Sequence, residues 1–538
     1  MLSQIDSKNH ANYTRTQSCC IIFTMNENST NIFSKTQRFA QTQPQINNTH
    51  PNYDRWVCGL IILHLILWTL IPTLVRHALP MDALEGFVWG QSWQLGYDRN
   101  PWLNAWLTHI AVNFGGYSGW MVYFVSQLSV VACFWAVWQL GKKILSPVYA
   151  LVAVFLLEAI QYYSLAAVDL NDNVLEIGLW ALAILYFYKA LVLQKKCDWL
   201  ITGLLAALSL MTKYYAAVLF LPMLCVLFFT QEGRASFKKS GIYLAMIIFL
   251  LVVLPHFIWL FNNGFVTLNY AMVRVAATND WQYSGWYFAL MHILAFLPPL
   301  LLFLLLWIGR KGGQVLNEVK NMGRFNKTFL VVLGFGPFVV TVLLAMLGKI
   351  SLHVMWGTPL LSLWGLLLVA FLQPYMNITR AKFYRFVSSI LLVFLAVAAI
   401  YAYNMIYVGY ASSATYPGKM IANYIEKTWG IYSKQQPYYV VGDRYTAGNV
   451  AYFADNKLKS CIWDDKIYSC DADNWLRSRG AVFVWRADDA EQANAKVIIA
   501  RIKQKFPKVM FLPEKNFSWI YHADKPNLKI GIAFLLPN

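Results

Sequence analysis

The chain has 538 residues, of which 58% are hydrophobic and only 13% charged, and it contains 22 tryptophans. Apolar runs of about 20 residues, the length needed to cross about 30 Å of hydrocarbon, recur along it. This composition excludes a soluble globular enzyme and predicts a membrane protein. The formal net charge of +18 does not indicate nucleic-acid binding, because the positive residues gather in alternate loops between the apolar runs.

Residues 1–55 precede the first apolar run and differ from the rest of the chain. They are rich in Asn, Gln, Thr and Ser and show no helical or strand periodicity. Such a composition predicts a disordered tail. No cleavable signal peptide is expected, and Met25 is an alternative start.

Eleven apolar segments follow and predict an α-helical polytopic membrane domain over residues 56–407. The expected spans are 57–75, 118–140, 147–166, 173–192, 199–212, 214–230, 241–261, 286–309, 328–347, 357–373 and 386–407. The segment 199–212 is the shortest of them.

The distribution of lysine and arginine predicts the orientation of these spans. Most of the basic loop residues fall in one set of alternate loops: Lys142, Lys143, Lys195, Lys196, Arg234, Lys238, Lys239, Arg310, Lys311, Lys320, Arg324, Lys327, Arg380, Lys382 and Arg385. The opposite loops hold only Arg76, Arg99, Lys213, Arg274 and Lys349. The positive-inside rule then places the N-terminus in the cytoplasm of a multi-pass protein of a bacterial inner membrane. The loop 76–117 and the segment 408–538 would lie in the periplasm.

The segment 408–538 has the composition of a small soluble domain. Its local patterns predict strands at 438–443 and 481–487, a helix at 488–505, and a hairpin at 517–536 around a Lys-Pro-Asn turn. Alternating strand and helix signals favour an α/β domain.

Two of the eight cysteines, Cys461 and Cys470, lie in this exported segment. An oxidising compartment favours a disulfide between them. The alternative is a pair of buried free thiols.

The first outer loop is the most informative polar segment. From Met81 to Trp106 it reads MDALEGFVWGQSWQLGYDRNPWLNAW, with Asp82 and Glu85 about one helical turn apart and several tryptophans after them. Acidic side chains at a membrane surface are costly unless they have partners or a function. The pattern predicts a site that handles a polar group on a lipid-anchored substrate. The alternative is an ordinary charged loop with an interfacial aromatic belt.

Further polar residues fall at the outer ends of later spans. The acids are Asp169 and Asp172, and the bases are Lys213, His256, Arg274, Lys349 and His353. A phosphate needs cationic partners, and an attacking hydroxyl needs a carboxylate to accept its proton. The residues at this one face of the membrane include both kinds of group. Taken singly, a lysine here can simply snorkel to the interface, and a histidine can be satisfied at a helix end. Glu158, inside the third span, is predicted to be a hydrogen-bonded packing element, with a functional role as the alternative.

Four segments, in this order, resemble bacterial glycosyltransferases of the family 39 kind, relatives of the protein O-mannosyltransferases and of the lipid A aminoarabinose transferase. They are the acidic first loop, GLLAALSLMTKYYAAVLF, LPHFIWLFNNGFVTLNYAMVR and VGDRYTAGNVAYFAD. The resemblance extends from about residue 57 to the end of the chain. It implies the membrane-embedded GT-C fold, a polyprenyl-phosphate-linked sugar donor, and transfer on the periplasmic face with inversion at the sugar carbon.

The resemblance also implies roles for individual residues. Asp82 matches the Asp of the family's Asp-Glu pair, the proposed catalytic base, but the next residue here is Ala83, so the role of the paired Glu does not carry over. Glu85 matches a later acid, and Asp172 the acid of the second outer loop. The expected donor-phosphate set is Lys213, Arg274, His256, Lys349 and His353. The expected substrate-loop tryptophans, which would stack on sugars or seat the loop in the interface, are Trp89, Trp93 and Trp102.

The expected function is therefore an inverting glycosyltransferase with a periplasmic acceptor such as lipid A, lipopolysaccharide or another glycan. A protein O-glycosyltransferase on the same fold is an alternative. A transporter or lipid-linked sugar flippase is an alternative of another class, but it would place paired charges near the membrane midplane, where only Glu158 lies. No pattern predicts a cofactor or a metal site, although a divalent metal is compatible with the acidic residues. The expected partners are the lipid-linked donor, the acceptor and membrane lipid, with no nucleic acid.

Overall fold

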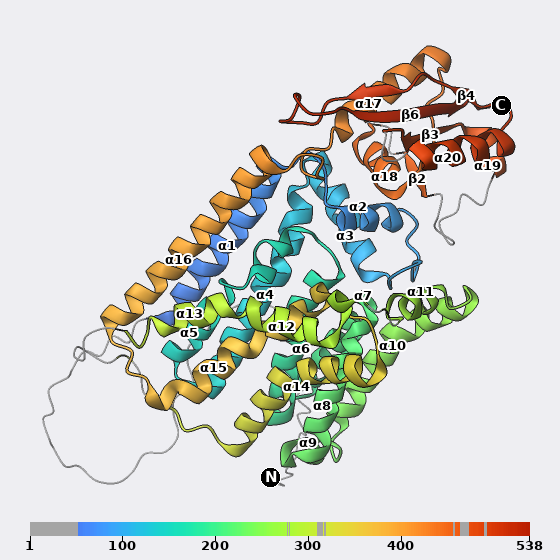
Figure 1. The fold of residues 1–538 in the computed structure, drawn as a ribbon. Coiled ribbons are helices and arrows are strands. Elements are labelled where there is room, and N and C mark those ends of the chain that lie inside the picture. The colour runs from blue at the N-terminus through green and yellow to red at the C-terminus, as the bar shows by residue number, and fades with distance from the viewer. Residues whose placement is uncertain are drawn as a thin grey trace, which may run out of the picture. The chain divides into compact units, whose positions relative to one another are not determined.

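The computed structural model describes residues 52–276, 278, 280–308, 316, 319–455, 458–462, 473–488 and 492–537, without the side chains of 473–475 and 492–493. The residues from Asn52 onward form one compact unit. In it, a bundle of apolar helices precedes a C-terminal sheet with its own helices (Figure 1). The predicted tail 1–55 lies almost wholly outside the described residues.

Within the described residues, eight helical segments are long and apolar enough to cross a membrane. They are α1 (Tyr53–Val75), α4 (Trp120–Ile144), α6 (Asp172–Leu193), α10 (Ser240–Asn262), α12 with α13 (Gly285–Leu304), α14 (Arg324–Gly348), η6 with α15 and η7 (Val354–Tyr375), and α16 with its terminal π turn (Arg380–Val408). A ninth span is possible if α5 (Pro147–Leu157) and the segment Gln161–Val168, bent by 79° relative to it, count as one. The chain is thus a multi-pass helical membrane protein.

The prediction of eleven spans is corrected to eight or nine. The expected spans 199–212 and 214–230 correspond to α7 (Lys196–Thr212) and α8 (Ala217–Phe229), which have 17 and 13 residues. Helices of this length fall short of the hydrocarbon thickness. An extended residue, Lys213, separates them.

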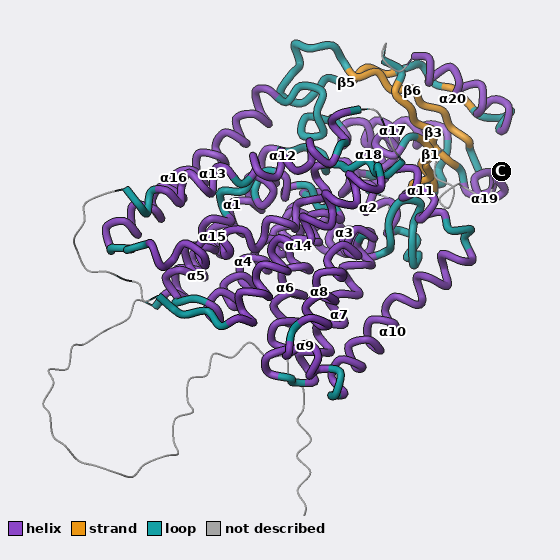
Figure 2. The backbone as a smooth tube through the Cα atoms, turned by 60° about the horizontal axis from the view of Figure 1, so that its bottom comes forward, coloured by secondary structure: helices purple, strands orange, loops and turns teal. Residues whose placement is uncertain are grey.

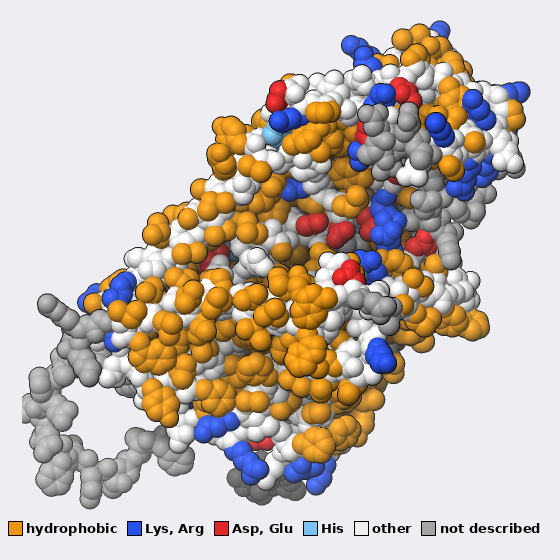
Figure 3. Space-filling view, viewed as in Figure 1, with side chains coloured by type: hydrophobic (Ala, Val, Ile, Leu, Met, Phe, Trp, Pro, Cys, Tyr) orange, Lys and Arg blue, Asp and Glu red, His pale blue; other side chains and the backbone are white. Residues whose placement is uncertain are grey.

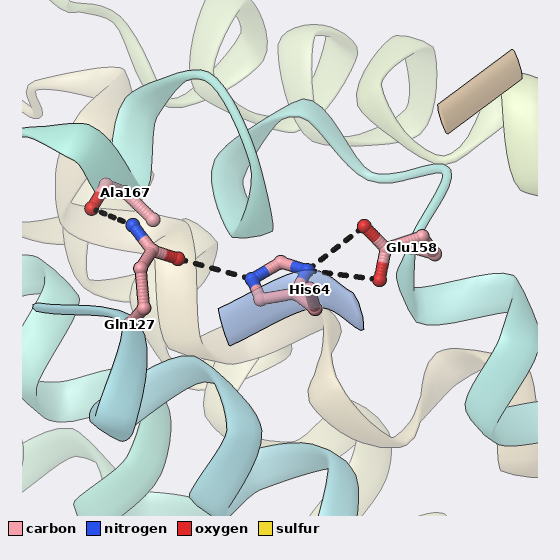
Figure 4. A network of polar contacts seen from close by, with 4 residues as sticks. All are labelled: His64, Gln127, Glu158 and Ala167. Atoms are coloured by element: carbon pink, nitrogen blue, oxygen red, sulfur yellow. Dashed lines mark hydrogen bonds and ion pairs between the residues drawn. The ribbon is translucent and has the colours of Figure 1, made fainter. Parts of the chain in front are cut away.

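The break after α5 is occupied by a buried polar network, which includes Glu158 (Figure 4). The Glu158 carboxylate lies 2.9 and 3.0 Å from Nδ1 of His64 in α1. Nε2 of His64 lies 3.0 Å from the side-chain oxygen of Gln127 in α4, and Gln127 donates a 2.8 Å hydrogen bond to the carbonyl of Ala167. The network therefore joins three helices, which confirms the prediction that Glu158 is a hydrogen-bonded packing element.

We expect Glu158→Ala to lower the free energy of unfolding by about 3 kcal/mol, because it leaves the buried His64 without its carboxylate partner. Glu158→Gln retains a hydrogen-bond acceptor and should be tolerated much better. Thermal unfolding of the purified variants measures both effects. Loss of catalytic activity by a stably folded Glu158→Gln variant would contradict a purely structural role.

Two short helices form the predicted outer loop 76–117. They are α2 (Met81–Gly90) and α3 (Leu103–Gly115), and they pack against each other. A third short helix, α11 (Val266–Arg274), follows α10. Thr267 of α11 donates a 2.6 Å hydrogen bond to the carbonyl of Tyr97, so α11 is held against this loop. These short helices lie near the end of α1 and the start of α6. This end of the helix bundle is called the site end below.

All named strands lie in the C-terminal part of the chain (Figure 2). The sheet has the order β2-β1-β3-β6-β4, with β5 also paired to β6. Its strands are β1 (Tyr439–Gly442), β2 (Lys459–Ile462), β3 (Ala481–Arg486), β4 (Met510–Phe511), β5 (Lys515–Phe517) and β6 (Leu528–Leu535). β1 runs parallel to β2 and β3, whereas β6 is antiparallel to β3, β4 and β5. The mixed sheet confirms the predicted α/β character of this segment.

Helices complete the C-terminal part: α17 (Gly418–Tyr432), α18 (Arg444–Phe453), α19 (Asp473–Arg479) and α20 (Gln492–Lys505). The predicted strands 438–443 and 481–487 are β1 and β3, and the predicted helix 488–505 is α20. The hairpin expected at 517–536 is only partly correct, because β5 ends at Phe517 and the chain then turns before β6. Cys461 in β2 is buried and disulfide-bonded. Cys470 lies outside the described residues, so its pairing with Cys461 stays a prediction.

Candidate active site

Acidic side chains meet basic ones at the site end of the bundle. In the space-filling view, Asp and Glu side chains gather in a hollow, with Lys and Arg side chains beside them (Figure 3). Two carboxylates from separate elements lie close together at this end: Asp82 in α2 and Asp169, which precedes α6. Burial and the nearby Asp82 carboxylate raise the pKa of Asp169, and the Arg76 charge opposes this shift.

The first turn of α6 organises this end. Asn171 caps the helix, since its side-chain oxygen accepts a 3.2 Å hydrogen bond from the Val174 amide. Its side-chain amide also donates to Asp82 at 3.4 Å. Asp172 is buried and accepts a 2.5 Å hydrogen bond from Asn100, in the loop between α2 and α3. The cap of one helix therefore fixes the position of a carboxylate on another.

Lys213 lies on the other side of the same turn. Its ammonium group donates a 2.7 Å hydrogen bond to Asn173, and it lies 4.9 Å from the ring centroid of Trp356. Burial lowers the pKa of Lys213, whereas the neighbouring carboxylates, Glu176 first among them, favour its charged form. The break between α7 and α8 thus presents a cation beside the acids of α6.

Arg274 and His353 border Lys213. Arg274 ends α11, and the backbone just after it is joined to the 349–353 loop: Ser351 donates to the carbonyls of Val275 and Ala276 at 3.1 and 2.8 Å. Burial and the charges of Arg274 and Lys213 lower the pKa of His353 to about 4. The charges of Arg274 and Lys213 are therefore near enough to His353 to disfavour its protonation.

The other two predicted phosphate-binding residues differ from this group. His256 is buried, and its ring nitrogens lie 2.7 Å from the Leu95 carbonyl and 2.7 Å from the Tyr214 hydroxyl. It therefore links α10 to the first loop. Lys349 is exposed at the end of α14 with φ of 50°, and its side chain makes no hydrogen bond or ion pair within the described part of the chain.

Glu85 is buried and forms ion pairs with two arginines. Its carboxylate lies 2.8 Å from Nε of Arg444, at the start of α18, and 3.7 Å from Nη1 of Arg99. Next to this ion pair, α18 approaches α2 so closely that a Cβ on Gly448 would lie 3.0 Å from Leu84. The arrangement fixes the first loop to the C-terminal part of the chain.

We expect Glu85→Ala to lower the free energy of unfolding by about 3 kcal/mol, because it removes a buried carboxylate that forms ion pairs with two arginines. Arg444→Ala should cost less, since Arg99 remains near Glu85. A matched control is Glu514→Ala, which breaks the half-exposed pair with Lys529 and should cost no more than about 1 kcal/mol. Denaturant unfolding of the three variants measures these differences, and equal effects of Glu85→Ala and Glu514→Ala would contradict the linking role.

The three predicted substrate-loop tryptophans have different environments. Trp89 is buried and stacks on Tyr97, with ring centroids 5.4 Å apart and planes 4° apart. Trp102 is half-buried against Trp106 at 4.6 Å. Trp93 is exposed and has φ of 51°, a left-handed conformation that non-glycine residues rarely adopt and that is often retained at functional loops. Of the three, Trp93 is therefore the one available to a substrate.

Two residues of the site end were not predicted as site residues from the sequence. Glu176 is fully buried one turn after Asp172, and neither carboxylate oxygen has a hydrogen-bond partner among the described residues. The sequence does indicate that Glu176 lies near Asp172, because residues four apart in a helix are on the same face. Arg444 lies within the quoted segment VGDRYTAGNVAYFAD, but its partner Glu85 is 359 positions away and no local pattern connects the two.

The chain is similar to known proteins in sequence and in fold. Residues 99–259 match the family described as dolichyl-phosphate-mannose-protein mannosyltransferase. The crystal structure of ArnT from Cupriavidus metallidurans bound to undecaprenyl phosphate superposes with a TM-score of 0.57 at 14% identity, over 90% of this chain and 98% of that chain. The chain has the GT-C fold. The predicted resemblance to this group of membrane glycosyltransferases is thereby confirmed.

Sequence relatives of this chain include two lipopolysaccharide core galacturonosyltransferases, RgtA and RgtB, from Rhizobium johnstonii. They are 23% and 22% identical over 227 and 231 residues. Each alignment covers 42% of this chain, and 44% and 47% of the respective relative. The chain thus spans less than half the length of the curated relatives it matches.

Proposed function

We propose that the chain is an inverting glycosyltransferase that moves a sugar from a polyprenyl-phosphate donor to an acceptor at the periplasmic face of a bacterial inner membrane. One observation carries the proposal. The first turn of α6 holds both a carboxylate and a lysine in place, through Asn171 to Asp82 and through Asn173 to Lys213. A base and a phosphate-binding cation are the two groups that such a transfer needs.

In the proposed reaction, an acceptor hydroxyl attacks the anomeric carbon of the donor sugar. Asp82 accepts the hydroxyl proton as the new glycosidic bond forms. The bond between the anomeric carbon and the phosphate oxygen breaks on the opposite face, which inverts the configuration. Lys213, with Arg274 and beside His353, stabilises the negative charge that develops on the departing polyprenyl phosphate. If the acceptor group is itself a phosphate, it is already ionised, and Asp82 orients it.

The relatives support the choice of substrates. ArnT of Cupriavidus metallidurans binds undecaprenyl phosphate, and RgtA and RgtB act on the lipopolysaccharide core. We therefore propose an undecaprenyl-type donor and an acceptor in lipid A or the lipopolysaccharide core. A transporter would need paired charges near the membrane midplane, of which the His64–Glu158 pair is an example. The contacts of Asp82, Asp172 and Lys213 instead gather at the site end, which favours the transferase.

Mass spectrometry of the cell envelope tests this function. Lipid A and core oligosaccharide from cells that lack the chain should be lighter by one sugar residue than those from cells that produce it. A sugar lost only from envelope proteins would instead support the protein O-glycosyltransferase alternative. Identical glycans and proteins in both strains would contradict a transferase role.

The proposed topology predicts opposite behaviour of two reporter fusions. A reporter that is active only in the periplasm should be active when fused after Gly409 and silent when fused at Gly313, because the basic loops face the cytoplasm. Enzymatic activity of both fusions in intact cells is the measurement. The reverse pattern would place Asp82 and Lys213 on the cytoplasmic side and contradict the proposed site.

A further inference from the structure

The C-terminal part of the chain contains a cavity of about 650 Å³. Its walls are the segment 411–416, the start of α18, one face of α20, Trp519 and Met81. A volume of this size lies within the range of sites that enclose small organic ligands. No residue proposed above for the transfer reaction lines it.

Two arginines are among the residues that line the cavity. Arg501 lines the cavity, is exposed, and makes no ion pair within the described part of the chain. The other basic residues of α20, Lys496, Lys503 and Lys505, do not line the cavity. Arg486, at the end of β3, lines the cavity as well and is held by two hydrogen bonds to Asp488 at 2.9 and 2.7 Å. Arginine is the side chain best suited to bind carboxylate and phosphate groups.

Asp443 is the one acidic residue among those that line the cavity, and its carboxylate is engaged in hydrogen bonds within the protein. It caps α18 and accepts hydrogen bonds from the amides of Tyr445 and Thr446 at 3.0 and 2.8 Å. Burial raises its pKa, and the nearby Arg486 charge opposes the shift. Both amide hydrogen bonds end on Oδ1, so the start of α18 offsets part of the negative charge of Asp443.

Aromatic rings form another part of the cavity lining. Tyr416 packs edge-on against Tyr445 and Trp519, with ring centroids 4.9 and 6.0 Å apart. Such rings offer flat apolar surface together with polar edges. A lining that holds both arginines and aromatic rings has the groups needed to bind an acidic sugar.

The cavity adjoins the first loop. Met81, which lines it, directly precedes Asp82, and the Tyr445 hydroxyl donates to the Leu79 carbonyl at 3.4 Å. The segment 411–416 is also joined to the end of α1, because the His77 amide donates to the Ala414 carbonyl at 2.8 Å. A saccharide seated here would therefore border the loop that carries the proposed base.

We propose that this cavity binds the anionic saccharide portion of the acceptor, with Arg501 and Arg486 contacting its carboxylate or phosphate groups. That the bound saccharide belongs to the acceptor rests on the proposed function, whereas the binding of an anionic saccharide in this cavity does not. The two can therefore fail separately.

Equilibrium binding without donor tests the proposal. The full chain in phosphatidylcholine nanodiscs is titrated by calorimetry with trigalacturonic acid, which carries a carboxylate on each ring, and with neutral maltotriose. The acidic trisaccharide should bind at least about tenfold more tightly. Arg501→Ala should weaken its binding by about tenfold, the loss expected for one charge-assisted contact. Lys503→Ala, which removes a cation from the same helix outside the cavity lining, should bind as the wild type does.

Three results would overturn the proposal: no binding of trigalacturonic acid, equal binding of both trisaccharides, or equal weakening by Arg501→Ala and Lys503→Ala. Loss of the binding when the nanodiscs contain phosphatidylglycerol would assign the cavity to lipid headgroups, which also overturns it. If binding is as expected but no sugar is transferred from any polyprenyl donor, the proposed function fails and the cavity assignment stands.

Discussion

Replacing Asp82 with asparagine should reduce sugar transfer by about 10²-fold or more, the contribution typical of a positioned general base. The amide retains the shape of the carboxylate and much of its hydrogen bonding, including the contact to Asn171. It cannot accept the proton of the acceptor hydroxyl. Donor binding and folding should therefore survive, and the loss should appear in the rate of transfer measured in proteoliposomes.

Asp54→Asn is the matched control for this variant. Asp54 is also a hydrogen-bonded carboxylate, with partners Lys142 and Trp138 at 2.8 and 2.7 Å, but it lies at the start of α1, far along the helix from the site end. Its transfer rate should stay near that of the wild type. Near-wild-type transfer by Asp82→Asn would remove Asp82 from the mechanism.

Lys213→Ala should weaken donor binding and slow transfer together, each by about 10- to 100-fold. The estimate follows from the loss of one hydrogen bond to a charged group, worth about 1.5–3 kcal/mol. Binding of undecaprenyl phosphate and the transfer rate are measured on the same preparation. Lys213→Arg should recover part of the binding, because the positive charge remains.

Lys189→Ala is the control for Lys213. Lys189 likewise pairs with an acidic partner, Asp198 at 3.1 Å, and lies 4.1 Å from an aromatic ring, that of Tyr186. Lys189 lies near the C-terminal end of α6, away from the first turn where Asn173 contacts Lys213. Its removal should therefore not affect donor binding. If both alanine variants lose donor binding equally, Lys213 has no specific role in phosphate recognition.

Much of the fold can be predicted from this sequence because its signals are local. Hydrophobic length identifies helices such as α1, α4 and α10 directly. Strands β1 and β3 are short apolar runs, and α20 has helical spacing. Spans 199–212 and 214–230 were overcounted because hydropathy does not detect that the chain breaks at Lys213 and that the two pieces are too short.

The composition of the site is harder to predict, because it depends on which side chains meet in space. Asp82, Asp172 and Lys213 were identifiable by residue type, position and family resemblance. The ion pair of Glu85 with Arg444, and the use of both ring nitrogens of His256, depend on contacts between segments far apart in the sequence. The sequence does not distinguish Glu176 from Glu158, because each is a single acid within an apolar segment, and Glu158 is hydrogen-bonded within the helix bundle.

Transfer of label from a synthetic polyprenyl-phosphate sugar is the most direct test of the central claim. The purified chain in liposomes is incubated with a radiolabelled donor and with lipid A or core oligosaccharide, and the anomeric configuration of the product is determined by NMR. We predict label in the acceptor with inverted configuration relative to the donor, and about 10²-fold or more slower transfer by Asp82→Asn. No transfer to any such acceptor from any polyprenyl-phosphate sugar, or a product with retained configuration, would contradict the account.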